Sequence, residues 1–535
     1  MKAKHLLRRP VSTIILFTSL ALLGLLCFSL ADAGPAAAAP QATTITVNSG
    51  SDPDTSQSAT CISHTPCTLR RAIVQARNTA GDVVIAFDIP ESAAEGWNSA
   101  LDIWKINVNE ITPISGSVFR RLTGNITIDG STQPGGRSSG PKIIIHGPKT
   151  GQNDGLIVGD FAGHDHIVIR GLGFQNLTTH ITINTDYNTI EDCWFGLSDD
   201  GTAMYMRGNN PDSGSGGTGV AVKIGANNNL IQNNVFLGIS GMSAQLDGDH
   251  NTFTNNYVGT RADGNVPDLA PSQVCSPVDW QGGSGLSISD DDNIIENNII
   301  AGLRLDVTPP SIQPDAIRVS GDNHIIRDNI IGEDVDGTQV GVCGRGIYLT
   351  SSTKYNLVTD NRIVSPGYSA ISLNDSPTDI ITFYGNTLRK NVIIKYTPWG
   401  DVEGQASPED AIQVAENMPT AFKNFKPAAV TSIEGVLISG TAGANSPCNL
   451  CTIEIFLDDD DGINEAIQSL AVVTADANGN WTATLPAALT AGQGLRTTTT
   501  TYEYGDIAGM YAGTTTGLSE LYVPGYEVFL PMISR

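Results

Sequence analysis

The sequence predicts an all-β fold in which a parallel β-helix, closed by a short N-terminal helix, precedes a small β-sandwich. Three observations predict it. Of 535 residues, 57 are glycine and only 16% are charged, against roughly 25% in an average globular protein. An Asn-rich motif recurs between residues 180 and 375, and short alternating apolar segments replace it after residue 425. This composition is too apolar for a disordered chain and too rich in turn residues for a helical one.

The N-terminal end is typical of an export signal. Four basic residues come first: Lys2, Lys4, Arg8 and Arg9. An apolar run over 11–31 follows, and Ala31-Asp32-Ala33 supplies a small-residue cleavage site. Residues 1–33 are therefore expected to be a cleaved signal peptide and 34–43 a flexible linker. The alternative is an uncleaved anchor, because about 20 apolar residues suffice to span a bilayer. The protein is expected to be secreted or held at the cell surface, and to meet a membrane only through a retained signal.

The charge of the chain excludes one class of partner. The formal net charge is −25 and the isoelectric point is about 4.5. Nucleic acids and anionic membrane surfaces attract basic proteins by long-range electrostatics. We therefore expect no nucleic-acid partner for this acidic chain.

The Asn-rich motif determines the predicted architecture. Its copies are Asn188–Cys193, Asn229–Asn234, Asn251–Asn256, Asn293–Asn298, Asn323–Asn329 and Asn356–Asn361. Each copy leads into a short apolar segment, and a base period of about 22 residues with surface insertions explains the spacing. The largest insertions, 200–218 and 262–283, are rich in turn residues. Three short strands and an Asn turn in each repeat are typical of a parallel β-helix.

Stacked coils place equivalent residues in columns. Because neighbouring strands lie about 4.8 Å apart, every column runs along the axis. The central apolar residue of each motif, such as Ile295, is expected to point inward and to be fully buried. Asn and Asp are expected in the turn columns, where their side chains bond the backbone in tight conformations. The usual chirality of β-crossovers predicts a right-handed coil.

Cysteine usage fits an exported protein, since disulfides persist in oxidising compartments. Seven cysteines lie outside the signal. Cys61–Cys67 and Cys448–Cys451 are local pairs, and Cys275–Cys343 follows by elimination. Cys193 falls in an Asn column and is expected to be an unpaired, packed thiol. The Cys-x-x-Cys at 448–451 has no second pair nearby, which favours a loop disulfide over zinc or redox chemistry.

Two segments resemble a known family. Cys67-Thr68-Leu69-Arg70-Arg71-Ala72-Ile73 resembles the CSLREA motif that opens many secreted bacterial β-helix proteins, and residues 127–135 resemble the strand and turn that follow it there. Gly-x-x-x-Asp-Gly turns at 196–201, 259–264 and 332–337 are also similar to that family's repeat. The resemblance implies export and a right-handed, pectate-lyase-like parallel β-helix over 96–425, preceded by a CSLREA-like cap over 44–95. It implies no established reaction.

The CSLREA-like segment predicts a helix over 68–78. Thr68 is placed to cap its first turn, but Arg71 stands where a capping box would have Glu, so the reciprocal bond is lost. An apolar face forms from Leu69, Ala72, Ile73 and Ala76. We expect this helix to cover the first coil, whose open edge would otherwise pair with another molecule.

After residue 425 the pattern changes to alternating strands. They are expected at Val436–Gly440, Thr452–Phe456, Ser469–Thr474 and Trp481–Leu485. A turn at 476–480 joins the last two, as in a β-hairpin. Residues 426–522 therefore resemble an immunoglobulin-like sandwich. The apolar tail 523–535 is either a last strand of this sandwich or a sorting signal.

One outward column is the candidate ligand face. Aligning the strand before each Asn turn gives the column Thr182, Lys223, Gln245, Ser287, Arg318, Tyr348 and Ser372. Lys223, Arg318 and Tyr348 are the candidate ligand residues, because bases and an aromatic ring suit a uronate or sulfated sugar. The neighbouring sheet's column is Glu191, Gln232, Thr254, Glu296, Arg327 and Thr359. There, Glu296 and Arg327 fall on successive coils and are expected to form a cross-strand ion pair.

The sequence also contains two groups of acidic residues and three histidines that are candidate metal ligands. Asp458, Asp460 and Asp461 in a sandwich loop could ligate Ca²⁺, although their spacing is not that of an EF-hand. Asp249 and 290–292 lie at equivalent turn positions and form either a solvated acidic ridge or a cation site. Three further residues, His164, His166 and His180, lack the neighbouring residues that would orient histidine ligands around zinc, and they are expected on the surface.

The sequence favours a non-catalytic exported protein that works in adhesion or in binding an extracellular or cell-wall polysaccharide. The alternative is a polysaccharide lyase or glycoside hydrolase acting on an acidic glycan. Glycoside hydrolysis requires two carboxylates about 5–9.5 Å apart across the substrate. No such outward pair stands out in the sequence, and no cofactor other than Ca²⁺ is suggested.

Overall fold

A computed structural model gives the fold. The described residues are 42–53, 58–108, 117–148, 154–160, 165–205, 217–223, 225–267, 283–303, 314–350, 353–373, 385–394, 410–414, 425–442, 448, 450–501 and 513–524. The expected signal peptide and the C-terminal tail from residue 525 lie outside them, as do Cys275 and His164. Within these ranges no helix is both long and apolar enough to cross a membrane.

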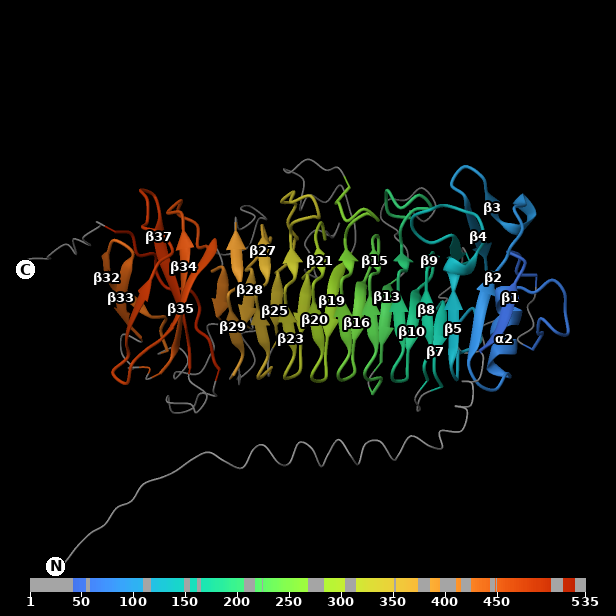
Figure 1. Ribbon diagram of the computed structural model, residues 1–535, viewed down its shortest axis with the longest axis horizontal. Coiled ribbons are helices and arrows are strands. Elements are labelled where there is room, and N and C mark those ends of the chain that lie inside the picture. Colours follow the sequence, from blue (N-terminus) through green and yellow to red (C-terminus); the bar gives the residue numbers. More distant parts are fainter. Residues whose placement is uncertain are drawn as a thin grey trace, which may run out of the picture. The chain divides into compact units, whose positions relative to one another are not determined.

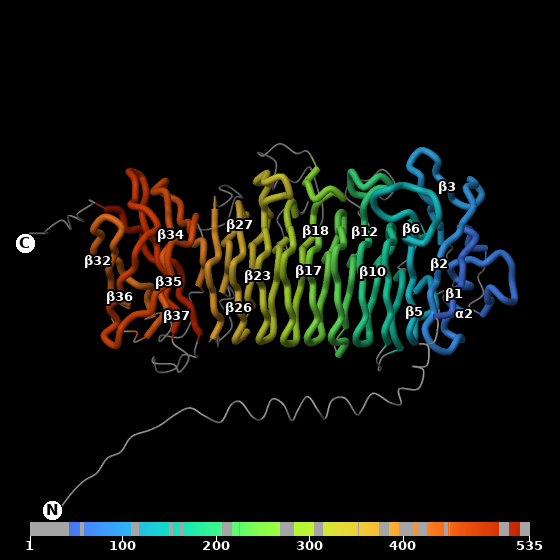
Figure 2. The backbone as a smooth tube through the Cα atoms, in the orientation of Figure 1, coloured from blue at the N-terminus to red at the C-terminus, as the bar shows by residue number. Residues whose placement is uncertain are grey.

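The chain winds through three parallel sheets in turn, and each coil from Ile126 onward contributes one strand to each sheet. Successive coils lie side by side along one axis, as the gradual change of colour in Figures 1 and 2 shows. Only the short β3–β4 pair within these sheets is antiparallel. The coils begin with the strand Thr43–Val47, which starts at the last residue of the expected linker and runs into the segment expected to form a cap. The predicted parallel β-helix is therefore the fold of this chain.

The strands are short, as three-sided coils require. The first sheet comprises β1 (Thr43–Val47), β2 (Val83–Phe87), β5 (Ile126–Asp129), β8 (Val168–Arg170), β11 (Thr189–Glu191), β14 (Leu230–Gln232), β17 (Thr252–Thr254), β20 (Ile294–Glu296), β23 (Ile325–Arg327), β26 (Leu357–Thr359) and β29 (Thr387–Arg389). The second comprises β7 (Leu156–Val158), β10 (Thr179–Ile183), β13 (Thr218–Val222), β16 (Met242–Leu246), β19 (Ser284–Ile288), β22 (Ile317–Val319), β25 (Ile347–Leu349), β28 (Ile371–Leu373) and β31 (Ile412–Val414). The third comprises β3 (Trp97–Asn98), β4 (Ile103–Asn107), β6 (Ile143–His146), β9 (Leu172–Gln175), β12 (Trp194–Phe195), β15 (Val235–Phe236), β18 (Tyr257–Val258), β21 (Ile299–Ile300), β24 (Ile330–Ile331), β27 (Arg362–Val364) and β30 (Val392–Ile394).

Two buried rows of side chains connect the coils at the ends of the first sheet. The first row is Asn188, Asn229, Asn251, Asn293, His324, Asn356 and Asn386, and the second is Cys193, Asn234, Asn256, Asn298, Asn329, Asn361 and Asn391. Most members accept the backbone N–H of the equivalent residue one coil earlier, as Asn256 does from Asn234 at 2.9 Å. Each bond satisfies a buried donor that the turn leaves without a ladder partner. The predicted Asn columns are confirmed.

The interior is a continuous apolar column. Ile295 is fully buried, as predicted. Phe174, Phe195 and Phe236 stack on successive coils, with ring centroids 5.3 and 4.7 Å apart. His180 packs edge-on against this stack and is fully buried, so the expected surface position of this histidine is wrong. Its burial lowers its pKa to about 4. His166, in contrast, is exposed.

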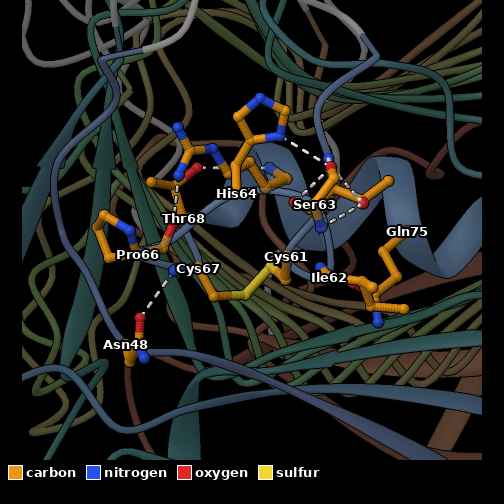
Figure 3. Close-up of a disulfide and its surroundings, with 11 residues drawn as sticks. Asn48, Cys61, Ile62, Ser63, His64, Pro66, Cys67, Thr68 and Gln75 are labelled. Atoms are coloured by element: carbon orange, nitrogen blue, oxygen red, sulfur yellow. Dashed lines mark hydrogen bonds between the residues drawn. A yellow bond between two sulfur atoms is a disulfide. The ribbon is translucent and has the colours of Figure 1, made fainter.

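A short helix covers the first coil. Helix α2 (Leu69–Arg77) starts one residue later and ends one residue earlier than predicted, and its expected apolar face is buried. The Thr68 hydroxyl caps the helix by accepting the Arg71 N–H. Arg71 donates instead to the Pro66 carbonyl at 2.5 Å. Figure 3 shows the Cys61–Cys67 disulfide directly before the helix, with the Asn48 side chain accepting the Cys67 N–H. Two single-turn 3₁₀ helices, η1 (Ala93–Glu95) and η2 (Gly130–Thr132), complete the helical elements of the described chain.

A sandwich of two antiparallel sheets follows the last coil. One sheet comprises β32 (Ala429–Glu434), β33 (Leu437–Thr441) and β36 (Asn480–Thr484), and the other β35 (Gln468–Thr474), β34 (Thr452–Asp458) and β37 (Gly494–Thr500). The sandwich bonds directly to the open edge of the final coil. The Thr515 hydroxyl accepts the Leu388 N–H at 3.0 Å, and Ile393 pairs with Ala466. The sandwich thus occupies the place of a further coil.

Candidate functional site

The outward column of the second sheet differs at one position from the predicted one. Thr182 pairs with Ala221, and Ala221 pairs with Gln245. Lys223 is exposed but lies two residues beyond the column, so its predicted alignment with Arg318 is wrong. From Gln245 onward the predicted register is confirmed, and the column continues through Ser287, Arg318, Tyr348 and Ser372.

The physical reason is a longer corner. Six residues separate Val222 from Asn229, whereas four separate Leu246 from Asn251. The extra two residues move β13 back relative to the Asn row. Counting six residues back from the Asn therefore reaches Lys223, which follows the strand, rather than Ala221 within it.

Arg318 and Tyr348 meet as predicted, and two further residues support them. The Arg318 guanidinium lies 5.1 Å from the centroid of the Tyr348 ring, and the Arg345 guanidinium lies 4.2 Å from it. Arg345 in turn contacts the Asp315 carboxylate, at 3.4 Å from Nη1 to Oδ2. The Asp315 carboxylate also accepts the Arg345 backbone N–H at 3.0 Å. Asp315, Arg345, Tyr348 and Arg318 together are called the Arg318 stack below.

Burial is uneven across the Arg318 stack. Arg318 is exposed, whereas Tyr348 is 6% and Asp315 only 3% exposed. Burial raises the pKa of Asp315, while the charge of Arg345 acts in the opposite direction. The covered tyrosine ring supports Arg318 and is not free to stack on a sugar, which corrects the role expected for Tyr348. The stack therefore presents one oriented cation to solvent.

Asp315 and Arg345 did not stand out in the sequence. Each comes three residues before a predicted ligand residue, Arg318 and Tyr348 respectively. Because β22 and β25 pair in register, equal offsets place both on neighbouring coils. The sequence signal that could have identified this pair is that Asp315 and Arg345 each lie three residues before a member of the outward column.

The first sheet carries a charged column in the predicted register. Glu191, Gln232, Thr254, Glu296, Arg327 and Thr359 align on successive coils. Arg327 and Glu296 form the expected ion pair at 2.6 Å. Arg327 is therefore exposed but neutralised, in contrast to Arg318.

The predicted calcium ligands form a different group. Asp458, Asp459 and Asp461 can bring one carboxylate oxygen each within 4.8 Å of one another, and Asp460 does not join them. Asp458 is fully buried and paired with Arg496. Its oxygens also accept the backbone N–H groups of Asp460 and Glu465. A carboxylate held in this way already has its partners, so the geometry supports a structural loop anchor here.

The cysteines fall largely where the sequence placed them. Cys61–Cys67 and Cys448–Cys451 are disulfides, with Cα atoms 4.6 and 5.5 Å apart. Cys343 is also disulfide-bonded, while Cys275 lies outside the described residues. Cys193 is a buried free thiol, as predicted, and burial raises its pKa to about 12. A thiol that stays protonated and inaccessible has a packing role.

Comparison with known proteins agrees with the fold. Residues 276–444 match the family described as the right handed beta helix region. No curated protein matches the chain. Similar solved structures include the catalytic domain of an α-1,3-glucanase in complex with nigerose (12% identity, TM-score 0.34, 72% of this chain and 71% of that one). They also include a tailspike protein of an E. coli bacteriophage (12% identity, TM-score 0.30, 81% and 88%). Identities and TM-scores this low bear on neither ligand nor chemistry. The chain folds as a right-handed parallel β-helix, as its sequence predicts.

Proposed function

We propose that this chain is an exported, non-catalytic protein that binds an acidic polysaccharide along the outer face of the second sheet. The observation that carries the proposal is the Arg318 stack. Arg318 is exposed and forms no ion pair with any described residue. Its positive charge acts at longer range, where it opposes the rise in the pKa of Asp315. In a chain of net charge −25, an exposed arginine held on an aromatic ring has a clear use in anion binding.

The geometry of the stack favours binding. Tyr348 and Arg345 hold the Arg318 guanidinium in one place, which lowers the entropy lost when a ligand carboxylate or sulfate engages it. A hydrogen bond between charged groups contributes about 1.5–3 kcal/mol. Loss of Arg318 is therefore expected to weaken binding by about ten- to a hundredfold.

The same stack gives no support to the lyase or hydrolase alternative. Its single carboxylate, Asp315, is buried and engaged by Arg345. Glycoside hydrolysis needs two carboxylates that flank the scissile bond. The Arg318 stack supplies a cation without such a pair.

The test is retention on affinity gels that contain polygalacturonate. Arg318→Ala is expected to migrate faster than wild type, and Tyr348→Phe, which keeps the ring, is expected to be retained. Arg327→Ala is the matched control, because Arg327 is also exposed on a strand but already pairs with Glu296. Equal retention of wild type and Arg318→Ala would refute the binding face. Release of shortened polymer by the wild type would favour the enzyme alternative.

Export is part of the proposal and rests on the signal-like pattern of residues 1–33. Expression with the native N-terminus is expected to place the mature chain outside the cytoplasm, with a new N-terminus after Ala33. Retention of the intact chain in the cytoplasm would contradict it.

A further inference from the structure

In six successive coils, the turn from the second sheet to the first has a residue with left-handed backbone at one fixed position. This residue directly precedes a member of the first Asn row. The set, called the corner row, is Tyr187 (φ 61°), Asn228 (57°), His250 (56°), Asp292 (60°), Asn323 (60°) and Tyr355 (58°). Each of the first five donates its N–H to a carbonyl of the next coil, as Asn228 does to Asp249 at 3.1 Å.

Two of the six residues do not suit this conformation. Asn, Asp and His tolerate the left-handed region, whereas a bulky tyrosine is strained there. Tyr187 and Tyr355 are nevertheless 48% and 47% exposed. They are the only aromatic residues among the large, exposed hydrophobic side chains of the described chain. Core burial therefore does not offset the strain, and strain retained at an exposed aromatic residue points to a function at the surface.

The two tyrosines are set along the axis of the coils. Five coil steps separate Tyr187 from Tyr355, which corresponds to about 24 Å. The positions between them carry the hydrogen-bonding side chains of Asn228, His250, Asp292 and Asn323. The corner row is thus a polar strip with an aromatic ring at each end.

The residues directly before the corner row are mostly acidic. Four of the six are Asp186, Asp249, Asp291 and Asp322, and the other two are Asn227 and Lys354. Oδ1 of Asp249 accepts the Asp291 N–H, and Oδ1 of Asp291 accepts the Asp322 N–H, each at 2.9 Å. These bonds fix the carboxylates, and the second oxygen of Asp249 and Asp291 has no hydrogen-bond donor within the described residues. Asp249 and Asp291 belong to the predicted acidic ridge, and backbone donors hold them in place.

Four aliphatic residues and two threonines follow on the other side. Two residues beyond the corner row, on the strands of the first sheet, come the half-buried residues Thr189, Leu230, Thr252, Ile294, Ile325 and Leu357. A sugar ring has apolar faces and a hydroxyl edge, and this combination of surfaces matches both.

We propose that the corner row binds a neutral polysaccharide. Tyr187 and Tyr355 stack on sugar rings, and the fixed carboxylates accept hydrogen bonds from sugar hydroxyls. The same carboxylates repel a polyanion, so this strip and the Arg318 stack select different glycans. The inference is independent of the proposed acidic-glycan function, because it uses different residues on a different part of each coil.

The test replaces each tyrosine by the residue that the corner row uses elsewhere. Tyr187→Asn and Tyr355→Asn, singly and together, are measured against soluble β-glucan, xyloglucan and dextran. Each single variant is expected to raise Kd for the glucan that wild type binds by about tenfold or more, because one of two linked contacts is lost. The thermal midpoint is expected not to fall, since Asn tolerates the left-handed backbone. Tyr187→Phe and Tyr355→Phe keep the ring and are expected to keep the affinity.

Arg318→Ala serves as the reciprocal control: it is expected to lose polygalacturonate and keep the neutral glucan. Unchanged neutral-glucan affinity in the double Asn variant, or no binding of any of the three glucans by wild type, would overturn the inference. Retention on chitosan alone, unaffected by loss of the tyrosines, would also overturn it, because charge would then account for all binding.

Discussion

Replacing Glu454 by glutamine is expected to change how the stability of the chain depends on pH. Glu454 lies in β34, is 1% exposed, and accepts the Lys390 N–H with both carboxylate oxygens, at 3.2 and 3.0 Å. One coil earlier, the equivalent Asp360 N–H donates to the Arg389 carbonyl. Lys390 lies on the last coil of the described chain, where no further coil supplies a carbonyl for its N–H. The Glu454 carboxyl accepts this N–H in its place.

The sign of the effect follows from the pKa. Burial raises the pKa of Glu454 to about 7, from an ordinary value of 4.5. The folded chain therefore holds the proton more tightly than the unfolded chain. The stabilisation that the protonated Glu454 carboxyl provides is complete below pH 4.5. It declines as the pH rises to 7 and changes no further above pH 7. A shift of this size corresponds to about 3 kcal/mol, at 1.36 kcal/mol per unit.

The assay is urea denaturation of the full chain between pH 4.5 and 8. Glutamine keeps a carbonyl acceptor for Lys390 but does not ionise. The free energy of unfolding of Glu454→Gln, relative to wild type, is therefore expected to rise by about 3 kcal/mol from pH 4.5 to 8. Glu434→Gln, at an exposed position on β32, is the control and is expected to follow the wild type. Parallel profiles for Glu454→Gln and wild type would refute the assigned role of the carboxyl.

Two further substitutions test the coil interior. The first is His324→Asn, which introduces the residue found at the other positions of the first Asn row. Wild-type His324 accepts the Asn293 N–H at Nδ1. Burial of the His324 side chain lowers its pKa. Its stabilisation is present above the ordinary pKa of 6.5 and is lost on acidification, so His324→Asn is expected to retain more stability than wild type as the pH falls below 6.5; equal acid sensitivity in urea titrations would contradict this. Ile295→Ala is expected to cost about 2–5 kcal/mol through the cavity it leaves, and a loss well below that in the same titrations would mean that Ile295 is not packed as described.

The sequence predicted the structure best where one residue type fills the same structural role in every coil. The Asn rows recur because a buried turn donor needs a side-chain acceptor, and this requirement fixed the register of the first sheet, including the Glu296–Arg327 pair. His324 replaces Asn in the row because its Nδ1 can also accept. The register of the second sheet was less certain, since corner length varies between coils and displaced Lys223 by two residues.

Other features could not be predicted because they depend on contacts distant in sequence. Strand β37 consists largely of threonines, and the run 497–501 is almost fully buried through hydroxyl bonds such as Thr497 to Ala428. No apolar alternation marks such a strand. The burial of Asp315 and His180 likewise follows from packing between coils. The strain at Tyr187 and Tyr355 became visible only with the backbone angles.

The most direct test of the binding face is a crystal structure of the chain soaked with an oligogalacturonate. The account predicts a sugar carboxylate within hydrogen-bond distance of the Arg318 guanidinium, with Tyr348 still covered by Arg345. An oligosaccharide bound elsewhere on the β-helix, with the Arg318 side chain facing solvent, would contradict it.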